Sequence, residues 1–133
     1  MGMNSGQEYH TRQTHYLVAD VVWDQGTGVY SVGWLPKDAM VIGGGIAVET
    51  AFAAGGANTV DVGFRNDGAG RTADPDAFAT LVAVNTAGFK VLDEIAAATN
   101  LPHRSGAEVT VRYNGTTPTD GKGTVVIEYA VLR

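Results

Sequence analysis

The sequence predicts an all-β fold, a jelly-roll-like sandwich of about eight strands with an extended N-terminal arm. Several segments place apolar residues at every second position, which is the periodicity of a half-buried strand. Turn-forming glycine, asparagine and aspartate residues separate these segments at intervals of roughly ten residues, as in sandwiches and barrels. The 133 residues also include 18 glycines and only 4 prolines, and glycine provides the positive φ angles that turns and bulges need.

The first half of the chain contains four segments that we expect to be strands. Tyr16–Trp23 and Val29–Leu35 are rich in valine and aromatic residues, and the turn sequence Asp24–Gly28 separates them. This order favours a hairpin between the two strands. Ile46–Phe52 and Thr59–Phe64 then alternate apolar and polar or small residues, as two further strands would.

The second half contains the clearest alternation and the least certain segment. Ala107–Tyr113 alternates strictly between apolar and polar residues. Thr124–Leu132 is apolar on both sides apart from Glu128, so we expect a central or doubly covered strand. Ala77–Ala87 is compatible with a strand, whereas Val91–Thr99 leaves a short helix and irregular structure open as alternatives.

Composition restricts the classes of function. The chain has no cysteine, so disulfides and thiolate metal sites are excluded. Acidic residues outnumber basic ones by 14 to 9 and no two basic residues are adjacent, which disfavours nucleic-acid binding. No apolar stretch is long enough for a membrane span, and none follows a basic start as in a secretory signal. We therefore expect a soluble protein made in the cytoplasm.

We predict a polar arm over residues 1–15 and one sandwich domain over residues 16–133. Such an arm can become ordered on binding or can add a strand to a neighbouring sheet. Met3–His15 is therefore our candidate for contact with a partner or another subunit. The candidate contact residues are Gln7, Tyr9, Arg12 and His15.

Two glycine-rich or acidic segments could suggest ligand sites. Gly43–Gly45 lacks the spacing and the following helix of a dinucleotide-binding loop and the lysine of a P-loop. We expect a bulge, or a bend where one strand changes sheet. Asp67–Asp76 could hold calcium, but its spacing does not match an EF-hand. A solvated loop whose aspartates cap turns is the preferred interpretation.

Catalytic constellations are not evident, and we expect neither an enzyme nor a cofactor or metal. His10, His15 and His103 show no ligand spacing, and the serines Ser5, Ser31 and Ser105 lack a nucleophile motif. A glycosidase would need two facing carboxylates, and the candidates on predicted strands are Glu49, Glu108 and Glu128. Solubilising surface charges are the simpler explanation for them. Trp23 and Trp34 favour a core or interface position over a sugar-stacking platform.

Most of the chain after Tyr16 resembles the head decoration (cement) proteins of tailed bacteriophages. The segments that carry the resemblance are Leu35–Phe52, Asn58–Phe64, Asp74–Asp76, Ala87–Phe89, Val109–Tyr113 and Val125–Tyr129. The resemblance implies a β-sandwich on the outside of an assembled phage head in the virion, often as a homotrimer bound to the major capsid protein. It implies no cofactor and no catalysis, and it assigns no contact residue. The alternative is a ligand- or glycan-binding module of a phage tail or cell-surface protein.

Overall fold

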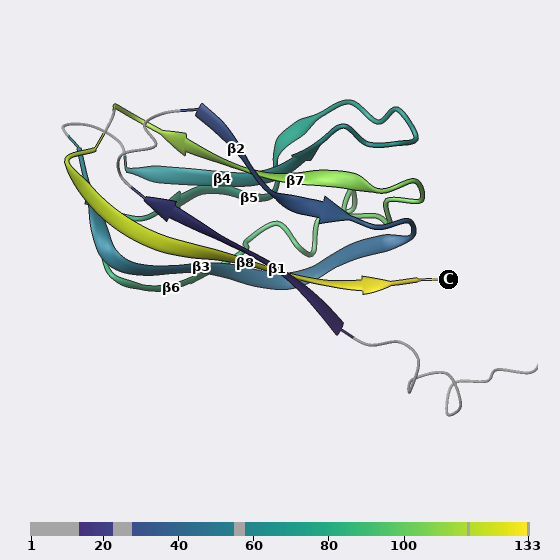
Figure 1. Ribbon diagram of the computed structural model, residues 1–133, viewed down its shortest axis with the longest axis horizontal. Helices are drawn as coiled ribbons and strands as arrows, with labels where there is room; N and C mark the ends of the chain where they lie inside the picture. Colours follow the sequence, from purple (N-terminus) through teal and green to yellow (C-terminus); the bar gives the residue numbers. More distant parts are fainter. Residues whose placement is uncertain (1–13, 23–27, 55–57, 117, 133) are drawn as a thin grey trace, which may run out of the picture.

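Eight strands form two four-stranded antiparallel sheets that pack face to face in the computed structural model (Figure 1). The structure describes residues 14–22, 28–54, 58–116 and 118–132. Sheet A has the order β1-β8-β3-β6 and consists of β1 (Thr14–Val22), β8 (Asp120–Val131), β3 (Ala39–Ala53) and β6 (Gly88–Val91). Sheet B has the order β2-β7-β4-β5 and consists of β2 (Gly28–Leu35), β7 (Ala107–Asn114), β4 (Thr59–Arg65) and β5 (Asp74–Ala83).

The strands pair in a nested order. β1 pairs with β8, β2 with β7, β3 with β6 and β4 with β5, all antiparallel. This is the pairing of one long hairpin that has been rolled into two sheets, which is the jelly roll. The predicted all-β sandwich of eight strands is therefore confirmed, and the described ranges contain strands, turns and loops but no helix.

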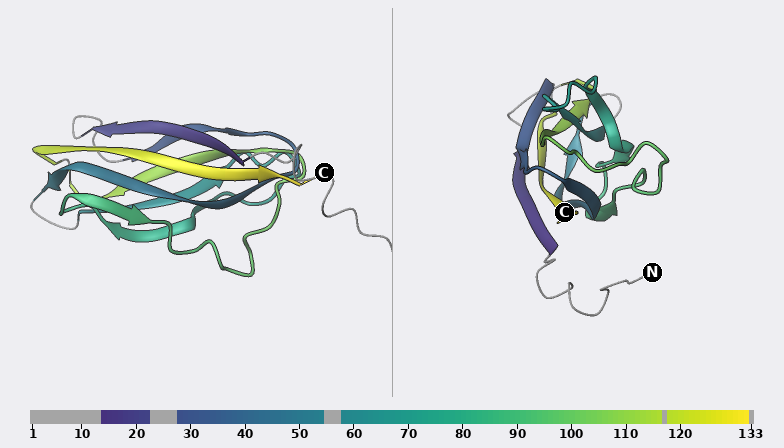
Figure 2. Two further views of the ribbon diagram at one scale, coloured as in Figure 1. Left: turned by 90° about the horizontal axis from the view of Figure 1, so that it is seen from below. Right: turned by 90° about the vertical axis from the view of Figure 1, so that its right-hand side faces the viewer.

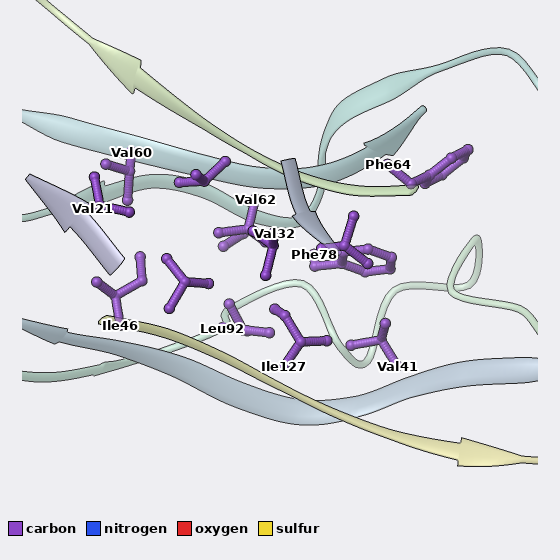
Figure 3. Close-up of a cluster of buried hydrophobic side chains, with 14 of the residues drawn as sticks. Val21, Val32, Val41, Ile46, Val60, Val62, Phe64, Phe78, Leu92 and Ile127 are labelled. Atoms are coloured by element: carbon purple, nitrogen blue, oxygen red, sulfur yellow. The ribbon is translucent and has the colours of Figure 1, made fainter. Parts of the chain in front are cut away.

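The core lies between the inner faces of the two sheets (Figure 3). The two-residue period of the strands places Val60 and Val62 of β4 and Val109 and Val111 of β7 on the inner face of sheet B, where all four are buried. Ile127 of β8 faces them from sheet A. Each fully buried valine or isoleucine contributes about 1.5–3 kcal/mol to stability. The central position predicted for the last strand is confirmed, since β8 lies between β1 and β3.

The predicted hairpin between the first two strands is wrong. β1 belongs to sheet A and β2 to sheet B, so their connection passes from one layer to the other. The two strands form one side of the sandwich, where Leu17 of β1 packs over Gly33 of β2. Turn residues between two strands favour a reversal of the chain, but they do not decide whether the returning strand pairs or crosses to the opposite sheet.

The short helix considered for Val91–Thr99 is absent. β6 ends at Val91, and the residues that follow form turns along the β5/β6 side of the sandwich (Figure 2). Leu92 enters the core, and the N–H of Glu94 donates to the carbonyl oxygen of Phe78 at 3.0 Å. These contacts replace helical hydrogen bonds, because a nine-residue helix has little stability of its own.

The Gly43–Gly45 triplet forms a bulge inside β3. The register of β3 against β8 shifts between Val41 and Gly43, and Gly44 has a φ of +115°. A Cβ atom at Gly44 would lie 2.1 Å from the carbonyl oxygen of Val126, so only glycine fits there. The bulge is confirmed, but the change of sheet is wrong, since β3 pairs with β8 on both sides of it.

Gly63 offers a test of how closely β5 crosses β4. An ideal Cβ at Gly63 would lie 2.0 Å from the carbonyl oxygen of Asp74 and 2.4 Å from the carbonyl carbon of Pro75. Because backbone atoms would have to move, we expect Gly63→Ala to lower the free energy of unfolding by about 3 kcal/mol in chemical denaturation. Gly123→Ala is the control, since its nearest contact is 3.1 Å, and it should cost less than about 1 kcal/mol. Equal costs would contradict the close crossing.

Candidate contact surfaces

The outer face of sheet B carries two ion pairs of opposite polarity. The register of β4 and β7 places Asp61 opposite Arg112 and Arg65 opposite Glu108. Nε of Arg112 donates to Oδ2 of Asp61 at 3.0 Å, and Nε of Arg65 donates to Oε1 of Glu108 at 2.7 Å. Since each strand contributes one acid and one base, a shift of register would separate both pairs. The pairs therefore stabilise this particular alignment of the two central strands.

Asp61 is buried although it lies on the outer face of the sheet, and it is only 2% exposed. Its Oδ1 accepts the N–H of Leu81 at 2.7 Å, where a bulge of β5 gives Leu81 a φ of +50°. Burial alone would raise the pKa of Asp61, but the hydrogen bonds from Leu81, Arg112 and Asn114 together lower it. The carboxylate is therefore charged and fully engaged within the chain.

Glu108 is not the solvated surface charge that the sequence pattern suggested. Its side chain is 8% exposed, and Nδ2 of Asn66 adds a hydrogen bond of 3.0 Å to that of Arg65. The hydrogen bond from Arg65 is the main reason why the pKa of Glu108 is lowered, and Ser31 and Asn66 add to it against the effect of burial. Alternation in β7 placed Glu108 correctly on the polar face, but the side chains of Arg65 and Asn66 cover its carboxylate there.

The three glutamates of the hypothetical glycosidase pair do not converge. Glu108 lies on sheet B, whereas Glu49 and Glu128 lie on sheet A. Glu128 is opposite Gly43, six residues before Glu49 along β3, which corresponds to about 20 Å of extended strand. Glu49 instead forms an exposed pair with Lys122, at 3.4 Å.

One end of the sandwich is closed by a cluster that we call the end cluster, formed by Asp67, Arg71 and His103. Nδ1 of His103 lies 2.8 Å from Oδ2 of Asp67, and both side chains are buried. Arg71 lies over the ring of Phe64 at 4.9 Å, and its guanidinium donates to the carbonyl oxygen of Thr99. The backbone of His103 adds an isolated bridge to Ala39 of β3.

The fold lowers the pKa of His103 and so favours the neutral form of its ring. Burial is the main cause that lowers its pKa, the charge of Arg71 acts in the same direction, and the hydrogen bond to Asp67 opposes both. For Asp67, burial would raise the pKa, but the hydrogen bonds from the side chain of His103 and from the backbone N–H groups of Ala69 and Arg71 lower it. The uncharged ring therefore donates its Nδ1 proton to an ionised carboxylate. Its position in the core shows a structural function for His103, which spacing in the sequence did not reveal.

The acidic stretch Asp67–Asp76 does not form one solvated loop. Asp67 is buried in the end cluster, where its Oδ1 also accepts the N–H of Ala69 at 2.8 Å. Asp74 and Asp76 lie at the start of β5, and the hydrogen bond with Asp74 is the main reason why the pKa of Asp76 is raised. In the described ranges, no three His, Cys, Asp or Glu side chains gather as a metal site.

The strands of sheet A face the viewer in the left view of Figure 2, and the outer face of this sheet is apolar in its middle. Residues that are directly opposite in an antiparallel pair share one face of the sheet. The register places Val18 opposite Val126, Val126 opposite Gly45, Gly45 opposite Val91, and Ala47 opposite Phe89. Tyr16 is on the same face as Val18, two residues before it. We call this row the apolar band, and its members are Tyr16, Val18, Val126, Phe89 and Val91.

Of the predicted contact residues, Gln7, Tyr9 and Arg12 lie outside the described residues. His15 belongs to β1, which begins at Thr14, and its ring stacks on Tyr129 with a centroid distance of 5.4 Å. Trp34 is 58% exposed on sheet B, where it is opposite Glu108, while Trp23 lies outside the described residues. A platform of both tryptophans therefore stays untested. The described ranges contain no helix that could cross a membrane.

The Asp61–Arg112 pair can be tested by a double-mutant cycle. We expect Asp61→Ala to cost about 3–5 kcal/mol in free energy of unfolding, because it leaves Arg112 and the N–H of Leu81 without their acceptor. The double variant Asp61→Ala/Arg112→Ala should lose less free energy of unfolding than the sum of the losses in the two single variants. The exposed pair is the control, and Glu49→Ala should cost less than about 1 kcal/mol. Additive costs for Asp61 and Arg112 would show that they are not coupled.

The end cluster predicts a pH dependence of stability. The pKa of His103 is lowered in the fold, so the unfolded chain, with a histidine pKa of about 6.5, binds this proton first and stability falls as the pH drops below about 6.5. Asp61, Asp67 and Glu108 have lowered pKa values and so add a second loss below about pH 4.

Denaturation at a series of pH values can separate the two losses. The free energy of unfolding of His103→Gln should be lower than that of the wild type but should change less between about pH 7 and pH 5. The loss below about pH 4 should remain in both proteins. His10 and His15 are common to both, so an equal slope in the upper window would show that His103 does not cause it.

No family model and no curated protein matches the chain. The solved structures that are similar to it include three that are each described by the phage capsid from which they come. A chain of the cyanophage Pam1 capsid asymmetric unit aligns with a TM-score of 0.64 and 16% identity, covering 91% of this chain and 86% of that one. A chain of the capsid of Ralstonia phage GP4 aligns with a TM-score of 0.62 and 19% identity, covering 92% of this chain and 84% of that one. A chain of the acidic stable capsid of Helicobacter pylori bacteriophage KHP30 aligns with a TM-score of 0.58 and 19% identity, covering 88% of this chain and 86% of that one. The chain thus has a fold that also occurs in phage capsid structures.

Proposed function

We propose that the chain is a structural protein of a phage capsid and that it binds the outside of the assembled head as a decoration protein. The observation that carries the proposal is the likeness of the whole jelly roll to chains in three phage capsid structures, over about nine-tenths of its length. The resemblance of strand and turn segments to decoration proteins agrees with it. The proposed location is therefore the virion, after synthesis in the host cytoplasm.

The distribution of polar groups supports a role in binding rather than catalysis. In the described ranges, His103 and Asp67 bind each other with both side chains buried, and the buried carboxylate of Asp61 is bound by Arg112. A catalytic group has to reach a substrate, whereas these groups hold loops and strands in place. The outer faces of the two four-stranded sheets are broad surfaces, which suit contact with other proteins.

We propose that the major capsid protein is the partner and that the chain acts as a homotrimer. Each copy would bury the area of a standard interface, about 800 Å² per partner. Three linked copies would bind several shell subunits at once, so the avidity would exceed the affinity of any single contact. The net charge of −5 supports a position on the outside of the shell, away from packaged DNA.

Two measurements test the proposal. Light scattering of the purified chain should give the mass of a trimer. Co-sedimentation with heads of the phage that encodes the chain should show saturable binding to expanded heads and none to unexpanded heads. A monomer that does not sediment with either kind of head would refute the proposal.

The same assay tests the N-terminal arm. Because Thr14 and His15 are part of β1, the deletion should end at Gln13 so that sheet A stays intact. We expect deletion of Met3–Gln13 to reduce head binding or trimer formation at least tenfold, with an unchanged circular-dichroism spectrum. Unchanged occupancy and mass would remove Gln7, Tyr9 and Arg12 from the contact surface.

A further inference from the structure

The apolar band of sheet A is exposed. Its side chains come from β1, β8 and β6, and Gly45 of β3 lies between those of β8 and β6. Tyr16 is 59%, Val18 60%, Phe89 58% and Val91 66% exposed. Residues of this size are usually scattered singly on protein surfaces, and a contiguous group indicates a contact site. Here β1, β8 and β6 contribute to one row, because the strand register brings them together.

The glycines of β3 keep the centre of this face flat. Gly45 lies between Val126 of β8 and Val91 of β6, Gly43 lies opposite Glu128 of β8, and neither glycine presents a side chain of its own. The carboxylate of Glu128 approaches the outer side of Gly43, where a Cβ atom would lie 3.1 Å from its Oε2. The ring of Phe89 approaches Gly45, where a Cβ atom would lie 2.6 Å from its Cζ. Any larger residue at Gly45 would push the Phe89 ring away from the sheet.

Two carboxylates on this face, those of Asp20 and Glu128, form no ion pair with another described residue. Asp20 and Glu128 are on the same side of sheet A as the apolar band, since they are opposite Thr124 and Gly43. Asp20 accepts the hydroxyl of Thr124 at 3.1 Å, and across the described ranges neither carboxylate is in an ion pair. The lysine at this end of β8, Lys122, is paired with Glu49.

The opposite face of the molecule shows the contrast. On sheet B, Asp61 and Glu108 each have an arginine of this chain as their partner. The two outer faces thus differ in one respect that matters for binding. On sheet B, both carboxylates are paired with arginines of the same sheet. Sheet A combines an apolar centre with two carboxylates that can still pair with a cation of another molecule.

We infer that the outer face of sheet A is the surface that docks on the capsid shell, against an apolar patch of the shell protein that is bordered by lysine or arginine. This inference rests on the proposed function and adds the face and the chemistry of the partner. A second copy of the chain fits less well, because an identical face would bring Asp20 and Glu128 toward like charges. The basic residues of the partner would instead pair with both carboxylates.

Head binding by matched variants tests the inference. Val18→Ser and Phe89→Ser remove apolar contacts, and Asp20→Lys and Glu128→Lys reverse the charges. Each should weaken binding to expanded heads at least tenfold, and the charge reversals should also reduce its salt dependence. Trp34→Ser on sheet B and Glu94→Lys in the loop after β6 are controls of the same kind, and both should bind like the wild type. Thermal unfolding checks that all six variants fold, as surface substitutions usually cost little.

Several outcomes would overturn the inference. Normal binding of the four sheet A variants with weak binding of Trp34→Ser would assign docking to sheet B. A wild-type oligomer that dissociates when Phe89→Ser is introduced would assign the band to contact between copies instead.

A probe without any capsid separates this inference from the proposed function. An eight-residue peptide of alternating leucine and lysine should shift the backbone amide signals of β1, β8 and β6 in nuclear magnetic resonance spectra, whereas a leucine–glutamate peptide should not. If heads bind no wild-type protein but the lysine peptide shifts these signals, the decoration function fails and the chemistry of the face stands. If neither peptide shifts them, the inference about the face is wrong.

Discussion

The structure depends on the burial of two apolar sheet faces against each other. Each strand can offer only alternate residues to the core, so every second side chain is directed to an outer face. The inner faces of both sheets consist mainly of valine, isoleucine and phenylalanine, so their composition differs little between the sheets. The polar and exposed apolar groups that distinguish the two sheets therefore lie on the outer faces, at the ends and in the loops of the described sandwich.

The two outer faces use the remaining positions in different ways. On sheet B, the central strands β4 and β7 place acid and base opposite each other, and the resulting pairs help to define their alignment. On sheet A, the central strands β3 and β8 place glycines beside valine and glutamate, so the neighbouring aromatic ring of Phe89 can lie close to the backbone. One face is thus consolidated internally, and the other is left smooth, apolar and acidic.

Much of the secondary structure could be predicted from local patterns, since alternation and turn residues act over a few positions. The strands around Val109 and Val60 follow from that alternation alone, and the strand around Val125 follows from a run of residues that is apolar on both sides. The partner of each strand could not be predicted in the same way, because β1 pairs with residues 100 or more positions away. The mistaken hairpin and the undecided choice between helix and irregular structure at Val91–Thr99 have this common origin, because nearby residues do not show the distant contacts that decide the structure.

The candidate contact surface shows the same limit more strongly. Tyr16, Val126 and Phe89 are unremarkable in the sequence, and only the register of the four strands of sheet A places them in one row. Likewise, alternation identified Glu108 as polar but could not show that Arg65 and Asn66 cover it. His103 gave no signal at all, because its partner Asp67 is 36 residues away and the spacing matches no motif.

The position of β8 has a consequence for how the protein is made in the cell. This strand is the last of the eight to leave the ribosome, yet it lies in the middle of sheet A and supplies Val126 and Glu128 to the outer face. Until residues 120–131 have been translated, β1 and β3 have no strand between them. Prematurely terminated copies would therefore lack both the complete sheet A and the outer face that it presents.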